Sequence, residues 1–126
     1  MHRSRLGAVV IDCRTDDLVA AAQFWATALG YRIAAEQSDS RYVGLEGPEG
    51  EPRILVQRVD HQSRVHLDIE SDNQAAEVAR LEAAGAKRVG ALKGWVVLEA
   101  PSGQRFCVVK PQRPDLAAHG NVWNVD

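Results

Sequence analysis

The chain is poor in the features that mark several large classes of protein. Its two cysteines, one in each half of 126 residues, are too few for the disulfide framework of a small secreted domain. The apolar stretch near the N-terminus, Leu6–Ile11, is too short for a signal-peptide core or a membrane span. We therefore expect a cytoplasmic protein with reduced thiols.

The chain also lacks a surplus of charge of either sign. Fifteen basic and seventeen acidic residues give a net charge of −2, and the basic residues are scattered, so we expect neither nucleic acid nor a membrane as a partner. There is no linker, no glycine-rich phosphate loop, no nucleophile elbow and no zinc signature. At 45% hydrophobic and 25% charged residues, the composition is typical of a single folded domain over residues 1–126.

What the chain does contain is an internal repeat of about half its length. The two copies are Val10-Ile11-Asp12-Cys13-Arg14-Thr15-Asp16-Asp17 and His66-Leu67-Asp68-Ile69-Glu70-Ser71-Asp72-Asn73. Each copy runs into an alanine-rich segment that stops at a glycine, Gly30 or Gly85. The repeat equates Asp12 with Asp68 and predicts that any site is built from two equivalent halves.

The spacing of apolar residues predicts the same order of elements in each half: a strand, a helix and three strands. In the first half these are a strand over Leu6–Arg14, a helix over Asp17–Leu29 with Thr15 or Asp16 as N-cap, and strands near Arg32–Glu36, Arg41–Glu46 and Arg53–Val59. In the second half they are a strand over Arg64–Glu70, a helix from a possible Ser71-x-x-Gln74 capping box to Ala84, and strands near Lys87–Leu92, Trp95–Glu99 and Arg105–Lys110.

The expected fold class is therefore α+β, with two tandem βαβββ modules whose sheets pair around a cleft. Module one covers about residues 6–60 and module two about 61–112, because a half-module alone buries only one face of its sheet. The C-terminal tail, residues 113–126, is expected to dock through Trp123. A homodimer is also expected, since oligomers of such units commonly use a two-fold axis.

Three groups of motifs carry a family resemblance. They are Phe24-Trp25-x-x-x-Leu29-Gly30-Tyr31, Val65-His66-Leu67-Asp68-Ile69-Glu70 with Ala83-Ala84-Gly85-Ala86, and Pro101-Ser102-Gly103-Gln104-Arg105-Phe106-Cys107-Val108-Val109. Together with the paired βαβββ modules, they make the chain, over about residues 6–112, resemble the vicinal oxygen chelate superfamily. Within it, the chain resembles the glyoxalase-like domain proteins of the glyoxalase/bleomycin resistance/dioxygenase type.

The resemblance also implies where a metal would be held. Metal-dependent members place four ligands on the first and last strands of the two modules, and the matching positions here are Val10, about Leu55, His66 and about Cys107. Valine and leucine have no donor atom, and a divalent metal needs at least three protein ligands. We therefore expect no metal and no other cofactor, which makes a metal-dependent glyoxalase or dioxygenase the weakest functional hypothesis.

The catalytic candidates are His66, Asp68 and Asp12. Alternation along a strand places Asp12 on one face of the first strand, and His66 with Asp68 on the equivalent face of the second. A histidine in a cleft exchanges protons near neutral pH, and its carboxylate neighbours can take acid or base roles. Alternatively, each aspartate accepts bonds from backbone N–H groups or an arginine, and His66 is a hydrogen-bonded core residue.

Five further residues are candidates for ligand binding. They are the aromatic Tyr42 and Trp95 on the third strands, Gln57 and Arg58 on the fourth strand of module one, and Cys107, for which a small buried hydrophobe is the alternative reading. Two functions follow, of which the sequence favours the first, and the second is the alternative. Cofactor-free binding of a small organic molecule predicts an aromatic cleft and an unreactive His66. A lyase- or isomerase-type enzyme predicts His66 within hydrogen-bond reach of Asp68 or Asp12.

Overall fold

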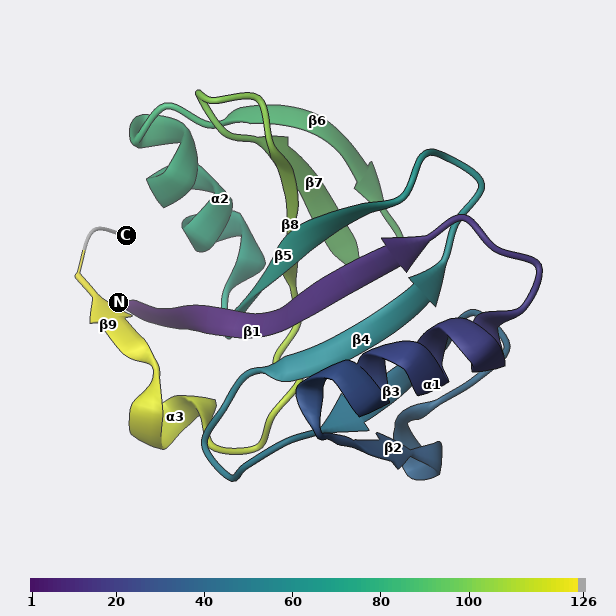
Figure 1. Ribbon diagram of the computed structural model, residues 1–126. Helices are drawn as coiled ribbons and strands as arrows, with labels where there is room; N and C mark the ends of the chain where they lie inside the picture. The colour runs from purple at the N-terminus through teal and green to yellow at the C-terminus, as the bar shows by residue number, and fades with distance from the viewer. Residues whose placement is uncertain (125–126) are drawn as a thin grey trace. The chain divides into compact units, whose positions relative to one another are not determined.

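The computed structural model describes residues 1–124 and divides the chain into two compact units. One unit is Ala8–His66, and the other combines Met1–Gly7 with the chain from Leu67 onward. The divisions fall inside strands β1 (His2–Cys13) and β5 (Arg64–Ser71), so each of these strands contributes to both units. In each unit a helix covers one face of a sheet (Figure 1). Within residues 1–124, no helix combines the length and apolar character needed to span a bilayer.

The Ala8–His66 unit forms the first βαβββ module. After β1 it contains α1 (Leu18–Leu29), β2 (Arg32–Ala34), the 3-10 turn η1 (Ala35–Gln37), β3 (Tyr42–Glu46) and β4 (Arg53–Arg58). The strand order is β2-β3-β4-β1, with β4 parallel to β1 and the other neighbours antiparallel. The first and last strands of the module are therefore side by side.

The second unit repeats this arrangement. After β5 it contains α2 (Gln74–Ala83), β6 (Lys87–Leu92), β7 (Trp95–Glu99), β8 (Arg105–Val109), α3 (Leu116–His119) and β9 (Asn121–Trp123). The strand order is β5-β8-β7-β6, with β8 parallel to β5. The expected α+β fold of two βαβββ modules is confirmed.

The two helices begin at cap residues other than those expected. Asp17 caps α1 by accepting from the Ala20 N–H, while the Thr15 hydroxyl accepts from the Asp17 N–H instead. Asn73 caps α2, and Ser71, still in β5, uses its hydroxyl on the Arg3 carbonyl. The capping-box prediction is wrong because the strand continues to Ser71. At the far end of α1, Gly30 adopts φ 71°, a left-handed conformation that favours glycine.

Each helix packs on its own sheet. In the first unit the buried cluster beneath the helix consists of Ala22 on α1 and Val43, Leu45 and Val56 on β3 and β4. In the second unit Val78 of α2 lies against Leu98 and Val108. The helix-covered faces are thus apolar, and the alternate strand positions, with the polar Asp12, Gln57 and Tyr42 among them, lie on the opposite faces.

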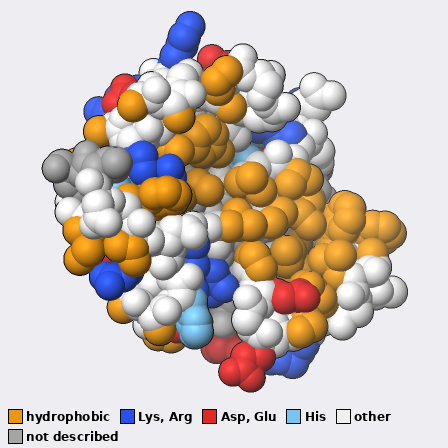
Figure 2. All heavy atoms as spheres, turned by 90° about the vertical axis from the view of Figure 1, so that its left-hand side faces the viewer, with side chains coloured by type: hydrophobic (Ala, Val, Ile, Leu, Met, Phe, Trp, Pro, Cys, Tyr) orange, Lys and Arg blue, Asp and Glu red, His pale blue; other side chains and the backbone are white. Residues whose placement is uncertain are grey.

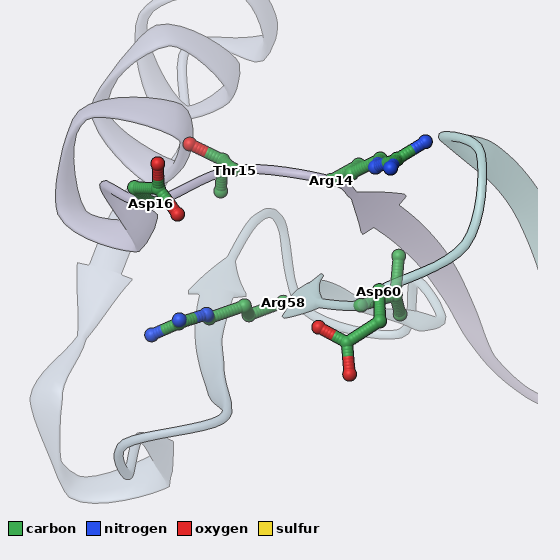
Figure 3. A pocket seen from close by; sticks show the side chains of 6 residues that line it. Arg14, Thr15, Asp16, Arg58 and Asp60 are labelled. Atoms are coloured by element: carbon green, nitrogen blue, oxygen red, sulfur yellow. The ribbon is translucent and has the colours of Figure 1, made fainter.

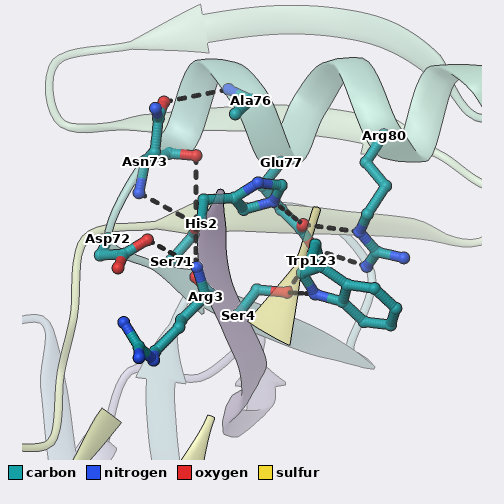
Figure 4. A network of polar contacts seen from close by, with 10 residues as sticks. All are labelled: His2, Arg3, Ser4, Ser71, Asp72, Asn73, Ala76, Glu77, Arg80 and Trp123. Carbon is teal, nitrogen blue, oxygen red and sulfur yellow. Dashed lines mark hydrogen bonds and ion pairs between the residues drawn. The ribbon is translucent and has the colours of Figure 1, made fainter. Parts of the chain in front are cut away.

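The C-terminal segment docks in the second unit, as Trp123 predicted. β9 pairs antiparallel with the first residues of β1, and the Trp123 indole N–H donates to Ser4 Oγ at 2.8 Å. The Ser4 hydroxyl and the His2 ring each contact the Glu77 carboxylate at 2.8 Å, and Arg80 pairs with the same carboxylate (Figure 4). His2 and Glu77 are buried, so this network joins both ends of the chain to α2.

Candidate functional site

The strand registers correct the residue equivalence that the repeat suggests. Across β1 and β4, Val10 lies opposite Leu55 and Asp12 opposite Gln57; across β5 and β8, Asp68 lies opposite Cys107 and Glu70 opposite Val109. Leu55 and Cys107 hold matching positions, because each precedes the fully buried valine of its strand. Asp68 therefore matches Val10, and the residue that matches Asp12 is Glu70.

The repeat and the strand registers differ by two residues in the partner that they give Asp12, and the difference arises in the segment between strand and helix. β1 ends at Cys13 and the N-cap, Asp17, follows four residues later. β5 ends at Ser71 and its N-cap, Asn73, follows two residues later. Equating Asp12 with Asp68 is wrong because that alignment matched the helix starts rather than the strands.

Glu70 is a buried carboxylate with both oxygens hydrogen-bonded. Oε2 accepts from Arg5 Nε at 2.8 Å and from Arg113 Nε at 3.1 Å. Oε1 accepts from the backbone N–H groups of Gln112 at 2.7 Å and Arg113 at 3.1 Å. Burial alone would raise the pKa of Glu70, but these bonds outweigh it and lower the pKa below its ordinary value. This carboxylate fixes the chain after β8 onto β5.

Asp12 is equally buried but only half satisfied. Its residue exposure is 3%, and Oδ2 lies 2.7 Å from His66 Nδ1 and 3.8 Å from Arg64 Nε. Among residues 1–124, Oδ1 has no hydrogen-bond partner although it is buried. Because a carboxylate only accepts, the His66 proton on this side is assigned to Nδ1, which leaves Nε2 as the basic nitrogen. Asp12 therefore has the position and partner of a group that orients a histidine.

Asp12 belongs to a row of polar side chains on the sheet face opposite α1. Gln57 lies opposite Asp12 on β4, and Tyr42 lies opposite Gln57 on β3. Both side chains are half-buried, and neither makes a hydrogen bond within the described part of the chain. The structure thus brings together three of the residues predicted from the sequence, and His66 joins them through Asp12.

Arg58 does not belong to this row. It lies opposite Cys13, on the face that α1 covers, because neighbouring residues on a strand point to opposite sides. There it lines a polar hollow of about 450 Å³ at the carboxyl ends of β1 and β4, together with Arg14, Thr15, Asp16, Val59 and Asp60. In Figure 3 the guanidinium groups of Arg14 and Arg58 point away from one another. The hollow therefore does not focus both charges on one point.

The remaining candidates lie in the second unit. Asp68, Cys107 and Val97 form one row across β5, β8 and β7, and Trp95 stands one row further, opposite Val109. These side chains share the sheet face opposite α2, and Trp95 is 40% exposed. Tyr42 and Trp95 take matching positions in the two modules, as their shared strand number predicted.

The two thiols are free and differ in setting. Cys13 packs under α1, where burial and, second, the charge of Asp12 raise the pKa of the thiol. A raised pKa leaves less of the reactive thiolate at neutral pH. Cys107 is half-buried on the sheet face opposite α2. Cys13 is therefore a core thiol, whereas Cys107 lies away from the helix-covered face, opposite Asp68.

The metal positions of the resembled superfamily are only partly filled by donor atoms. Val10 and Leu55 lie opposite each other and can coordinate nothing. On β5 and β8 the residues that offer a metal ligand at or next to the corresponding positions are His66, Asp68 and Cys107. Strands β1 and β4 contribute no ligand at these positions, so the four-ligand arrangement is not formed and we derive no step through a metal.

Comparisons with known proteins agree on the fold. The model of a family described as Glyoxalase-like domain matches residues 8–109. A hypothetical protein from Bacillus halodurans C-125 is similar at 12% identity and a TM-score of 0.62, with 87% of this chain and 96% of that chain covered. Methylmalonyl-CoA epimerase from Mycobacterium tuberculosis is similar at 17% identity and a TM-score of 0.58, with 90% and 91% covered.

A third similar structure is a glyoxalase/bleomycin resistance protein/dioxygenase superfamily member from Vibrio splendidus 12B01, at 15% identity and a TM-score of 0.57, with 87% of this chain and 99% of that chain covered. No curated protein sequence matches the chain significantly. At these identities the structural likeness concerns the fold alone.

Proposed function

Since the chain belongs to the glyoxalase-like domain family, we propose that it binds a small organic molecule and transfers a proton on it, with His66 as the acid or base and Asp12 as its partner. The reaction class is that of a lyase or isomerase. The observation that carries the proposal is the 2.7 Å contact between His66 Nδ1 and Asp12 Oδ2.

This contact gives His66 the attributes of a general base. A carboxylate that accepts from Nδ1 fixes the tautomer and the ring orientation, and it stabilises the imidazolium that forms when Nε2 takes up a proton. The His66 side chain is 16% exposed whereas that of Asp12 is 2% exposed. The histidine is therefore the member of the pair that can meet a substrate, and Asp12 is a positioning residue behind it.

The duplicated position in the second unit supports a functional role for Asp12. Glu70 uses both oxygens on two arginines and two backbone N–H groups, which accounts for its presence structurally. Asp12 makes no comparable set of bonds, and one of its oxygens is buried without a partner. A buried polar atom without a partner in a native protein calls for an explanation, and a catalytic role is one such explanation.

The test is proton exchange into deuterated water. Acyl thioesters, methylmalonyl-CoA among them, and 2-oxo acids are incubated with the protein in D₂O, and loss of the α-proton signal is followed by NMR. We expect exchange with the unaltered chain and a loss of about 100-fold or more in His66→Gln. His119→Gln is the matched control, because His119 is an exposed histidine in the other unit. Exchange that survives in His66→Gln contradicts the proposal.

Binding without turnover is the second candidate. The half-exposed Trp95 and the half-buried Tyr42, each on the sheet face opposite the helix of its unit, favour it. It predicts saturable binding of small aromatic molecules with no exchange in any of them. It also predicts that His66→Gln leaves binding largely intact.

Metal-dependent chemistry is the third and weakest candidate, because Val10 and Leu55 hold two of the four ligand positions. Elemental analysis of the purified protein tests it directly. Metal at near one equivalent per chain, lost in His66→Ala and Cys107→Ala, would favour this candidate over the other two.

The cytoplasmic location and the homodimer stay predictions. Figure 2 shows hydrophobic side chains gathered on one face of the molecule. Separately, α1 has no charged residue, and its Val19 and Phe24 are 60% and 63% exposed. These are side chains that a second copy would cover. We expect Phe24→Glu to lower the mass measured by light scattering from that of a dimer to that of a monomer.

A further inference from the structure

Asp12, Gln57 and Tyr42 form a row whose side chains carry polar groups without a hydrogen-bond partner among the described residues. These groups indicate the chemistry of the ligand. Asp12 Oδ1 is a buried acceptor without a partner in residues 1–124. Leaving such an atom unsatisfied costs about 1–3 kcal/mol. His66 and Arg64 both contact the other carboxylate oxygen, Oδ2, so neither of these residues donates a hydrogen bond to Oδ1. A group that donates a hydrogen bond must come from elsewhere.

The other two members of the row extend the same surface. Gln57 offers an amide that both donates and accepts, and Tyr42 offers a hydroxyl, and neither side chain is hydrogen-bonded within the described residues. Neighbouring strands are about 4.8 Å apart, so the row spans about 10 Å from Asp12 to Tyr42. Along the row the groups are the carboxylate acceptor of Asp12, the amide of Gln57, and the hydroxyl and aromatic ring of Tyr42.

We propose that this row recognises a small molecule bearing an O–H or N–H group, which donates to Asp12 Oδ1 while a second polar group of the same molecule meets Gln57 or Tyr42. The inference rests on the proposed function, because the donor is held beside His66. It goes further by naming the group that the substrate carries next to the centre of proton transfer.

The experiment compares matched probes in which each O–H donor is replaced by O–CH₃. Benzyl alcohol is paired with benzyl methyl ether, and catechol with 1,2-dimethoxybenzene, and binding at millimolar concentration is followed by backbone amide shifts in NMR. With the unaltered chain we expect each hydroxyl compound to bind about tenfold more tightly than its ether. Shifts are expected at Asp12, Gln57 and Tyr42.

Asp12→Asn sharpens the comparison. The Asn carbonyl takes over the bond from His66 Nδ1–H, so the amide nitrogen replaces Oδ1 and an acceptor becomes a donor. The preference should then shift toward the ethers. Asp16→Asn is the control, because Asp16 is exposed and lies outside the row. Equal binding of alcohol and ether, a preference unchanged in Asp12→Asn, or no binding by any hydroxyl compound would overturn the inference.

The outcome separates this inference from the proposed function. His66→Gln should abolish proton exchange and keep the preference for hydroxyl compounds. Exchange without a hydroxyl preference overturns the recognition by Asp12 alone. A hydroxyl preference without exchange overturns the enzymatic proposal alone.

Discussion

Asp12 and Glu70 occupy matching positions beside the parallel partner strand of their modules, yet only Glu70 has both carboxylate oxygens hydrogen-bonded. Both are buried, at 3% and 0% exposure. Equivalent positions of the two modules thus hold Glu70, whose hydrogen bonds give it a structural role, and Asp12, which has one oxygen without a partner among the described residues. This comparison inside one chain is a sharper criterion than burial, which treats the two alike.

Glu70→Gln should destabilise the protein strongly. The substitution keeps the shape of the side chain but removes the charge that faces Arg5 and Arg113, leaving two partly buried guanidinium groups opposite an amide. Breaking a buried ion pair from one side costs about 3–5 kcal/mol. Urea unfolding should show the loss as a lower midpoint at an unchanged slope. A loss below about 1 kcal/mol would mean that the arginines find other partners.

The unfolding free energy should fall as the pH falls below the ordinary glutamate pKa of 4.5. Burial alone would raise the pKa of Glu77, but hydrogen bonds from Arg80, His2 and Ser4 lower it, and the pKa of Glu70 is lowered likewise. A carboxyl whose pKa is lower in the folded state stabilises that state above its unfolded pKa, and loses this effect as the pH falls through the folded pKa.

Urea unfolding at several pH values between about 6 and about 3 tests this. The dependence should be shallower in Glu77→Gln than in Glu82→Gln, a substitution in the same helix at an exposed position. An equal pH dependence in the two variants would show that Glu77 titrates alike in the folded and unfolded chain.

The order of elements was predictable from the sequence because alternation and helical spacing are local properties. β6 and β7 begin and end at the expected residues, and α1 begins one residue after its expected start. α2 ends one residue before the expected Ala84, and its N-cap is Asn73, two residues after the expected Ser71. β1 begins at His2, four residues before the expected start at Leu6. The reason is not local: the extra residues pair with β9, from the other end of the chain.

The residues of the candidate site could be named from the sequence, but which of them lie together could not. His66, Asp12, Gln57 and Tyr42 could be named because polar side chains interrupt apolar strands. Strand register decides which of them meet, and a register depends on partners distant in the sequence. The match of Asp12 with Glu70 was hidden by the two extra residues before α1. The buried contact of His2 with Glu77 carried no sequence signal, since both look like ordinary surface residues.

Trp123 should hold the two ends of the chain on α2 by two separable contacts. Its indole N–H donates to Ser4 Oγ, and its ring lies 3.8 Å from the Arg80 guanidinium carbon. Trp123→Phe keeps a ring over Arg80 and loses the hydrogen bond, which should cost about 1 kcal/mol. Trp123→Ala loses both contacts and should cost about 3 kcal/mol or more.

Amide hydrogen exchange shows which part of the chain is destabilised when Trp123 is substituted. Protection of residues 2–4, which pair with β9, should fall in Trp123→Ala while that of α1 stays unchanged. An exchange increase spread evenly over the chain would indicate a global loss of stability rather than release of β9.

Asp12→Asn should remove activity while changing the unfolding free energy little. Glu70→Gln, in contrast, should lower the unfolding free energy strongly. Asp12 faces one half-exposed arginine at 3.8 Å and one histidine, and an asparagine oxygen can still accept from His66 Nδ1. The amide nitrogen that replaces the unsatisfied Oδ1 no longer buries a charge, so we expect a change within about 1 kcal/mol in either direction. Urea unfolding of the two variants side by side measures the contrast. If Asp12→Asn proves as destabilising as Glu70→Gln, Asp12 is a structural carboxylate like its counterpart, and the assignment of His66 as an oriented base loses its main support.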